Sequence, residues 1–154
     1  MELTEARDKA INKFNKLNRK EIECPAIWLR VRFSNEWFSH ITFKDKKHRR
    51  SEAEQIIRFQ CFLDVEEIIK KSYLMQEHMQ KEEIVKIRDH GQTKHVKKIV
   101  EYIWFVWVIT HNNTKSRTKV VIKIESDKDH AEYVSVIPAR NTKWYRNFNW
   151  QPGD

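Results

Sequence analysis

The sequence predicts an α+β domain in which N-terminal helices pack on an antiparallel β-sheet of four or more strands. Apolar residues recur at helical spacing over 3–20 and 51–71, whereas residues 27–33 alternate between apolar and polar side chains. Residues 98–110 are apolar on both faces for most of their length, which is typical of a strand covered on both sides. Helices followed by a run of strands indicate the α+β class.

The helical part is expected to span about 1–72, with one short strand at 27–33. One face of that strand is apolar, and the other carries Trp28, Arg30 and Arg32. These three side chains predict a basic surface that binds substrate and offers a ring for stacking. The alternative interpretation is an ordinary exposed strand face.

Capping residues mark two helix starts in this part. Ser34 or Asn35 can cap a helix that runs from about 36 to 48. Ser51 and Glu54 have the spacing of a capping box, which predicts the start of the longer helix that follows.

The strand-rich part covers about 83–138 and is followed by an aromatic and basic tail at 139–154. Its central strand is expected at 98–110. The preceding stretch, residues 74–82, is polar and charged and is interpreted as a loop or a helix extension. Alternation and turn signals, among them Gly91, predict the other strands at 83–89, 117–125 and 132–138.

The composition predicts a single domain, 1–154, with a polyanionic partner. The 154 residues include 30 Lys and Arg against 22 Asp and Glu, a formal charge of +8. This balance favours nucleic acid first and an acidic protein second. Two cysteines are too few for a disulfide framework or a zinc site. No apolar run reaches the roughly 18 residues of a membrane span, and no secretory signal is expected.

The stretch 39–50 is the strongest candidate for a site. Residues 44–50 hold five Lys or Arg and one Asp, a formal charge of +4. If the stretch is helical, His40, Lys44 and His48 follow one another at four-residue spacing and share one face. Two imidazoles, an ammonium and nearby guanidiniums suit a phosphodiester. The alternative is a solvated basic helix end.

Other chemistries find less support in the sequence. His40 and His48 have no carboxylate pair nearby, and Lys44 would repel a metal cation, so no metal site is predicted. The chain has no phosphate-binding glycine loop. Ser135 lacks the glycines of a nucleophile elbow, although its hydroxyl could donate a hydrogen bond to a phosphate.

Metal-independent RNA cleavage needs none of the missing features. The ribose 2′-hydroxyl attacks its own phosphorus, so the enzyme supplies a base, an acid and cations around the phosphorane. Histidine is the natural proton-transfer group near neutral pH.

The chain resembles the barnase/EndoU/colicin/RelE-like (BECR) nuclease superfamily, and within it the phage- and polymorphic-toxin-associated branches. The resemblance covers roughly residues 27–140. It is carried by His40-Ile41 with Lys44 and His48-Arg49 downstream, the helix from Ser51, and the strands 117–123 and 133–138. It implies helices ahead of a four-stranded antiparallel sheet whose concave face cuts RNA.

The resemblance also implies roles for individual residues. His40 would be the general base or acid, and Lys44, His48 and Arg49 would belong to the basic stretch beside it. Ser135 would be the hydroxyl residue of the last strand. The cation of the penultimate strand would be Arg117 or Lys119. We therefore predict that His40, Lys44 and Ser135 lie on one cleft. The alternative for His40 is a buried core histidine beside Trp37 and Phe43.

The resulting expectation is a metal-independent endoribonuclease without cofactors, a toxin or phage-associated effector that acts on RNA in the cytoplasm. The candidate substrates include tRNA, and the candidate protein partner is an acidic immunity or antitoxin protein. Two alternatives stay open: a non-catalytic nucleic-acid-binding module, and a phage or plasmid interaction protein. A binding face and a cleaving face need the same Lys, Arg and Trp residues.

Overall fold

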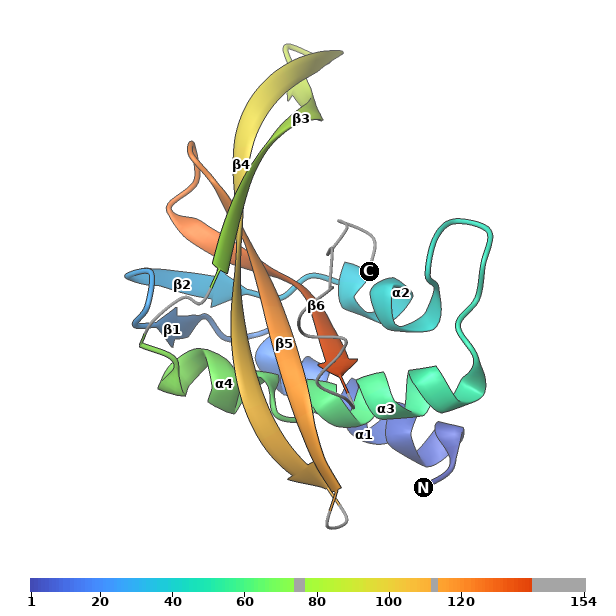
Figure 1. Ribbon diagram of the computed structural model, residues 1–154. Helices are drawn as coiled ribbons and strands as arrows, with labels where there is room; N and C mark the ends of the chain where they lie inside the picture. The colour runs from blue at the N-terminus through green and yellow to red at the C-terminus, as the bar shows by residue number, and fades with distance from the viewer. Residues whose placement is uncertain (74–76, 112–113, 140–154) are drawn as a thin grey trace.

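The structure, a computed structural model, describes residues 1–73, 77–111 and 114–139 and confirms the predicted α+β class. Within these residues four helices pack on a six-stranded sheet (Figure 1). The strand order is β1-β2-β6-β5-β4-β3. Neighbouring strands pair antiparallel, except β2 and β6, which are parallel.

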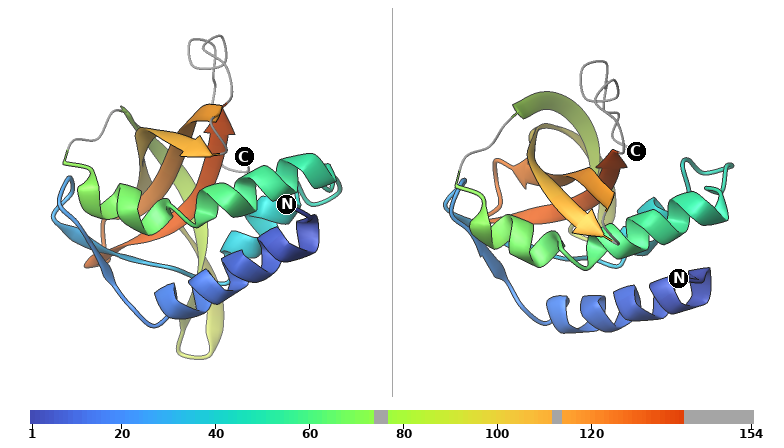
Figure 2. Two further views of the ribbon diagram at one scale, coloured as in Figure 1. Left: turned by 90° about the horizontal axis from the view of Figure 1, so that it is seen from below. Right: turned by 60° about the horizontal axis from the view of Figure 1, so that its bottom comes forward.

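The helices are α1 (Leu3–Leu17), α2 (Glu36–Thr42), α3 (Glu52–Phe62) and α4 (Val65–Lys71). The strands are β1 (Ile22–Cys24), β2 (Leu29–Arg32), β3 (Glu77–Asp89), β4 (Gln92–His111), β5 (Thr114–Glu125) and β6 (His130–Ala139). Helices α3 and α4 follow one another in a line, with α1 beside them (Figure 2). The β3–β4 hairpin extends away from these three helices (Figure 1).

Two clusters of buried residues lie on the two faces of the sheet. The larger cluster joins the helices to alternate residues of β4, β5 and β6, among them Ile103, Val120 and Val136. The smaller cluster is formed by strand residues. Among the described residues, its buried members are Val100, Tyr102, Trp104, Val121 and Ile137. We call the face with the smaller cluster the helix-free face. Because β4 contributes to both clusters, the predicted two-sided burial is confirmed for its middle part, from Val100 to Phe105. Ile99 and Val108, at either end of this part, are exposed.

The Trp37 side chain packs helix α2 against two other helices. The Trp37 ring stacks on Phe14 of α1, with ring centroids 5.0 Å apart, and on Phe62 of α3 at 4.4 Å. Such stacked pairs are worth about 0.5–1.5 kcal/mol beyond their buried area. The contact fixes the helix that carries His40 and the start of the loop that follows.

A two-residue turn at His90 and Gly91 closes the β3–β4 hairpin. Both residues have positive φ, 48° and 78°. The strands are in register up to the pair formed by Asp89 and Gln92. Positive φ at both central residues is the type I′ geometry, which matches the twist of the flanking strands. The turn that Gly91 signalled is therefore confirmed, with His90 as its first residue.

Helix α2 is shorter than predicted. It ends at Thr42, because Phe43 adopts an extended conformation and forms an isolated bridge with Arg49. The expected helix from about 36 to 48 is wrong over its second half. Consequently Lys44 and His48 do not continue the helical face of His40.

The helix from Ser51 begins as expected, but it is divided in two. The capping box of Ser51 and Glu54 is confirmed. At Leu63 and Asp64 the backbone N–H groups donate to carbonyls three residues back, which ends α3 before α4 begins at Val65. Helix α4 buries its own apolar residues and packs against β1.

The sheet is larger than the sequence indicated. Residues 77–82, expected as a loop or a helix extension, form the first half of β3. The run 98–110 belongs to β4, which lies inside the sheet but second from its edge rather than at its centre. Strand β1 and the parallel β2–β6 pair were not predicted. Of the predicted tail, residues 140–154 lie outside the described part of the chain.

Candidate nucleic-acid interface

The basic stretch after α2 folds as a short hairpin, which we call the basic loop (residues 43–50). Its ends are joined by the bridge between Phe43 and Arg49. The Lys44 N–H donates to the His48 carbonyl at 2.8 Å, and the Arg50 N–H donates to the Thr42 carbonyl at 2.9 Å. These backbone bonds close the loop directly on the end of α2.

Asp45 organises the tip of the basic loop. Its Oδ1 accepts hydrogen bonds from the backbone N–H groups of Lys47 at 2.8 Å and His48 at 3.0 Å. Both carboxylate oxygens lie 2.8 Å from Nδ1 of His48. These bonds hold the pKa of Asp45 below its usual value. The bond from the Lys47 N–H has the largest effect, and the bond to the His48 ring has the next largest. The charged carboxylate therefore fixes the backbone and the imidazole together.

The orientation of His48 leaves one ring nitrogen available. Because Nδ1 faces Asp45, the Nε2 atom points away from the carboxylate, and the side chain is 72% exposed. A carboxylate on one nitrogen of a histidine sets its tautomer and leaves the other nitrogen for chemistry. The same arrangement orients histidines that act as general bases. His48 thus has the support that proton transfer requires.

The other cations of the basic loop are free to meet a ligand. Lys44, Lys46, Lys47 and Arg49 are exposed, and none of them has an ion-pair partner among the residues that the structure describes. Asp45 is the single acidic residue of the stretch. The loop therefore presents a concentrated positive charge around His48, as phosphate binding requires.

Two arginines are buried at the root of the basic loop. Arg50 donates from Nε to the His40 carbonyl at 3.3 Å, while its own carbonyl accepts from Nε2 of Gln55 at 2.8 Å. Arg58 of α3 donates from Nη1 to the Val136 carbonyl at 3.1 Å, which ties α3 to β6. Sequence reasoning did not select Arg58, since a lone arginine within an amphipathic helix gives no signal of burial.

His40 lies on the last turn of α2, next to this root. Its side chain is partly buried, and desolvation is the largest cause that lowers its pKa from the ordinary value of 6.5. The Glu36 carboxylate opposes this shift, and the positive charges of Arg50 and Arg58 add to it. Its surroundings therefore favour the neutral imidazole, and they include the charges of Glu36, Arg50 and Arg58.

Ser135 is not exposed together with His40 and Lys44. It pairs with Val121 of the helix-free face and is only 3% exposed. Its Oγ has no hydrogen-bond partner among the described residues. The predicted open cleft that joins His40, Lys44 and Ser135 is therefore not formed by the described residues, because one of its members is inaccessible to a ligand.

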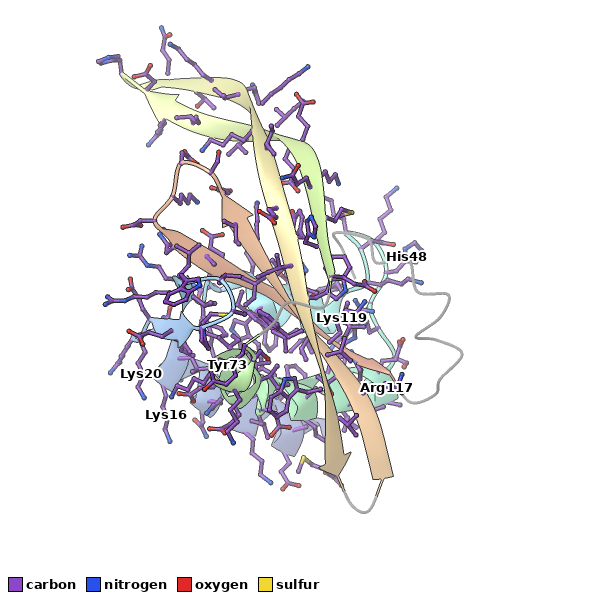
Figure 3. All side chains as sticks on the ribbon, turned by 60° about the vertical axis from the view of Figure 1, so that its left-hand side comes forward. Lys16, Lys20, His48, Tyr73, Arg117 and Lys119 are labelled. Carbon is purple, nitrogen blue, oxygen red and sulfur yellow. The ribbon has the colours of Figure 1, made fainter. Side chains whose placement is uncertain are left out.

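Lys119 and Arg117 of β5 are also on the helix-free face. Nζ of Lys119 lies 4.9 Å from the ring centroid of Trp104, in a cation–π contact. Burial is the main cause that lowers the pKa of Lys119, and the charge of Glu77 opposes it. Arg117 is partly buried. In Figure 3, His48, Lys119 and Arg117 all lie on the same side of the molecule.

The two arginines of β2 are exposed, and both are paired. Glu21 accepts from Arg32 at 2.6 Å and from Arg30 at 3.4 Å. The predicted strand 27–33 is confirmed only over Leu29–Arg32, where buried and exposed positions alternate. Trp28 is exposed as expected, but it lies in the turn before the strand, with a positive φ. The shared carboxylate neutralises part of the charge of the two arginines. Among the residues predicted to bind substrate, the exposed cations without an ion-pair partner therefore lie mainly in the basic loop.

Asp45 is the residue of this site that sequence reasoning missed. Its signal was local: an Asp three residues before a His, with Lys between them, can form a turn in which the carboxylate caps two backbone N–H groups. The expectation of a helix through residue 48 hid that turn.

The described residues contain no group of three or more His, Cys, Asp or Glu side chains arranged to hold a metal ion. Among them, no helix is both long and apolar enough to cross a membrane. The chain matches no protein-family model, and neither a curated protein nor a solved structure is significantly similar to it. The nuclease resemblance of the sequence therefore stays a prediction.

Proposed function

We propose that the protein is a metal-independent endoribonuclease that binds RNA through the basic loop and uses His48 for proton transfer. The observation that carries the proposal is the hydrogen bond from His48 to Asp45, 2.8 Å long, within a loop of unpaired cations. Orientation by a carboxylate is what an acid–base histidine needs.

In the proposed reaction His48 Nε2 takes the proton of a ribose 2′-hydroxyl. The 2′-oxygen then attacks phosphorus, and the bond from phosphorus to the 5′-oxygen breaks. The products are a 2′,3′-cyclic phosphate and a 5′-hydroxyl, whose oxygen is protonated by solvent water. The cations of the basic loop stabilise the negative charge that develops on the phosphorane.

The test is incubation of total RNA with the protein in the presence of EDTA, followed by gel electrophoresis. Wild-type protein should degrade the RNA, and His48→Gln should lose about 10²–10⁴-fold in rate, the usual contribution of a proton-transfer group. His40→Gln tests the predicted role of that residue as general base or acid. His90→Gln, in the hairpin turn, is the control for the loss of an exposed imidazole.

A second candidate function is RNA binding without cleavage. It is favoured by the exposure of the basic loop, since His48 is on a protruding hairpin and lines neither of the two described pockets. Active sites are usually concave. Salt-dependent RNA binding by a protein that yields no product in EDTA would support this candidate over the first.

The positive charge of the basic loop also suggests which partners the protein has and where it acts. We propose that RNA, with tRNA among the candidates, is bound in the cytoplasm. An acidic immunity or antitoxin protein would cover the basic loop by charge complementarity. Competition between such a protein and RNA for the loop is the expected behaviour.

A further inference from the structure

A pocket in the described residues lies away from the basic loop. It has a volume of about 840 Å³ and lies between the β1–β2 connection and the end of α4. Its lining includes the rings of Trp28 and Tyr73 and the charged side chains of Glu21, Arg30 and Lys70. A smaller pocket of about 250 Å³ shares Glu21, Trp28 and Arg30 and adds His130. We call the two together the Trp28 pocket.

Trp28 combines a strained backbone with an exposed ring. Its φ is +57°, in the left-handed region, and its side chain is 93% exposed. A positive φ on a bulky residue costs on the order of 1–3 kcal/mol. Glycine would adopt this backbone without strain. Because the ring gains almost no burial in return, its presence in the turn points to a ligand.

Tyr73 contributes the second ring from a fixed position. It is 74% exposed, and it directly follows Ser72 at the end of α4. The Ser72 hydroxyl donates to the Ile68 carbonyl at 2.6 Å and accepts from Nε1 of Trp107 at 2.9 Å. These bonds anchor the backbone immediately before Tyr73, so the ring extends from a rigid helix end.

The charges of the pocket are mixed rather than positive. Glu21 and Glu23 face Arg30 and Lys70 in its lining, and Glu21 already binds Arg30 and Arg32. A phosphate would gain little from this balance. A flat, uncharged ring with donors and acceptors on its edge would gain more, since two aromatic faces can stack on it and the carboxylates and guanidiniums can reach its edge.

We propose that the Trp28 pocket binds an unstacked nucleobase of single-stranded RNA, with its ring stacked on Trp28 and Tyr73. This inference rests on the proposed function, because the RNA is the one that contacts the basic loop. Tyr73 and His48 lie on opposite sides of the view in Figure 3, so the strand would cross the molecule between them. Base stacking contributes about 1–3 kcal/mol per base and tolerates any sequence.

The test measures binding of a fluorescent single-stranded oligoribonucleotide and of an RNA duplex by anisotropy at one fixed salt concentration. Trp28→Gly and Tyr73→Ala should each weaken single-strand binding by about 5- to 150-fold. This is the change in affinity that corresponds to the stacking energy of one base. Duplex binding should be unchanged, and Trp28→Phe should retain most of the single-strand affinity. Trp28→Gly should unfold at the same or a higher urea concentration than wild type, because glycine relieves the positive φ.

The outcomes separate this inference from the proposed function. If wild type binds single-stranded RNA and both variants bind equally well, the inference is overturned while RNA binding stands. If wild type binds no RNA, free nucleoside monophosphates are titrated while the Trp28 indole signal is followed by NMR. A specific shift would keep the nucleobase site and remove the RNA proposal. No shift, or a shift caused only by choline as a quaternary ammonium probe, would overturn the inference.

Discussion

Asp45 and His48 are joined side chain to side chain at 2.8 Å, and Asp45 also accepts the backbone N–H of His48 at 3.0 Å. One carboxylate thus shapes the basic loop and aims the imidazole. Breaking the ring contact while keeping the backbone contacts should reveal whether orientation of His48 matters for activity.

Asp45→Asn is the substitution that separates the two roles. The asparagine oxygen can still accept the Lys47 and His48 N–H groups, since Asn forms the same turn as Asp. It removes the negative charge beside the ring, and we expect RNA cleavage to fall by about 10- to 100-fold, as when other orienting partners of histidine are lost. Cleavage by Asp45→Asn at the wild-type rate would argue against the orienting role.

The basic loop should dominate the salt dependence of RNA binding. Removing Lys46 or Lys47 should lower the slope of log K against log salt by about one for each lost phosphate contact. Lys9→Ala is the matched control, because it removes the same charge from α1, where Lys9 is paired with Glu5 at 2.8 Å. Equal slopes for the loop variants and the control would show that the whole charge, not the loop, attracts RNA.

Glu66 should make the protein acid-sensitive. Lys13 donates to it at 2.5 Å across the α1–α4 contact and Lys70 at 2.9 Å, and together they lower its pKa from 4.5 to about 2. The folded state therefore gains stability from the charged carboxylate above pH 4.5, and this gain is lost as the pH falls from 4.5 toward 2. Glu66→Gln should cost about 1–3 kcal/mol of unfolding free energy at pH 7.

Glu67→Gln provides the control for that measurement. Glu67 is an exposed neighbour on the same helix, and its ion-pair partner among the described residues is Lys71, one turn away on α4. Urea unfolding of both variants at pH 7 and pH 3 should show a loss that is specific to Glu66 and larger at pH 7. An equal effect of the two substitutions would contradict a tertiary role for the Lys13–Glu66 pair.

His40 should give a separate pH dependence at higher pH. Burial lowers its pKa below 6.5, so the unfolded chain binds a proton before the folded one does. The contribution of neutral His40 to the unfolding free energy is fully present above pH 6.5. It is lost as the pH falls through the lowered pKa. His40→Gln should flatten the change in unfolding free energy between pH 7.5 and pH 5.5. NMR titration of His40 to a pKa at or above 6.5 would contradict this expectation.

The fold class could be predicted because both periodicities are strong in this chain. Helical spacing gave α1 and α3, and the apolar run of β4 indicated burial on two sides. The first half of β3 could not be predicted in this way, because residues 77–82 are polar and their strand state comes from pairing with β4. The parallel β2–β6 pair is a long-range contact without a local signal.

The location of the candidate site could be predicted from the composition of the stretch 39–50. Its geometry could not, because the stretch was expected to be a helix. The basic loop was chosen for its charge and its histidines, which required no knowledge of its shape. The interpretation as one helix failed at Phe43, whose extended backbone pairs with Arg49. That pairing separates His48 from the face of His40 and brings it to Asp45 instead. The burial of Ser135 depends on neighbours in other strands and has no signature in its own segment.

The most direct test of RNA cleavage by His48 is the analysis of RNA ends after incubation with wild-type protein and His48→Gln in EDTA. Wild type should yield fragments with 2′,3′-cyclic phosphate and 5′-hydroxyl ends. His48→Gln should cleave at a rate lower by about 10²–10⁴-fold, with the fold unchanged by circular dichroism. Equal cleavage by the two proteins, or no cleavage by wild type, would contradict this role of His48.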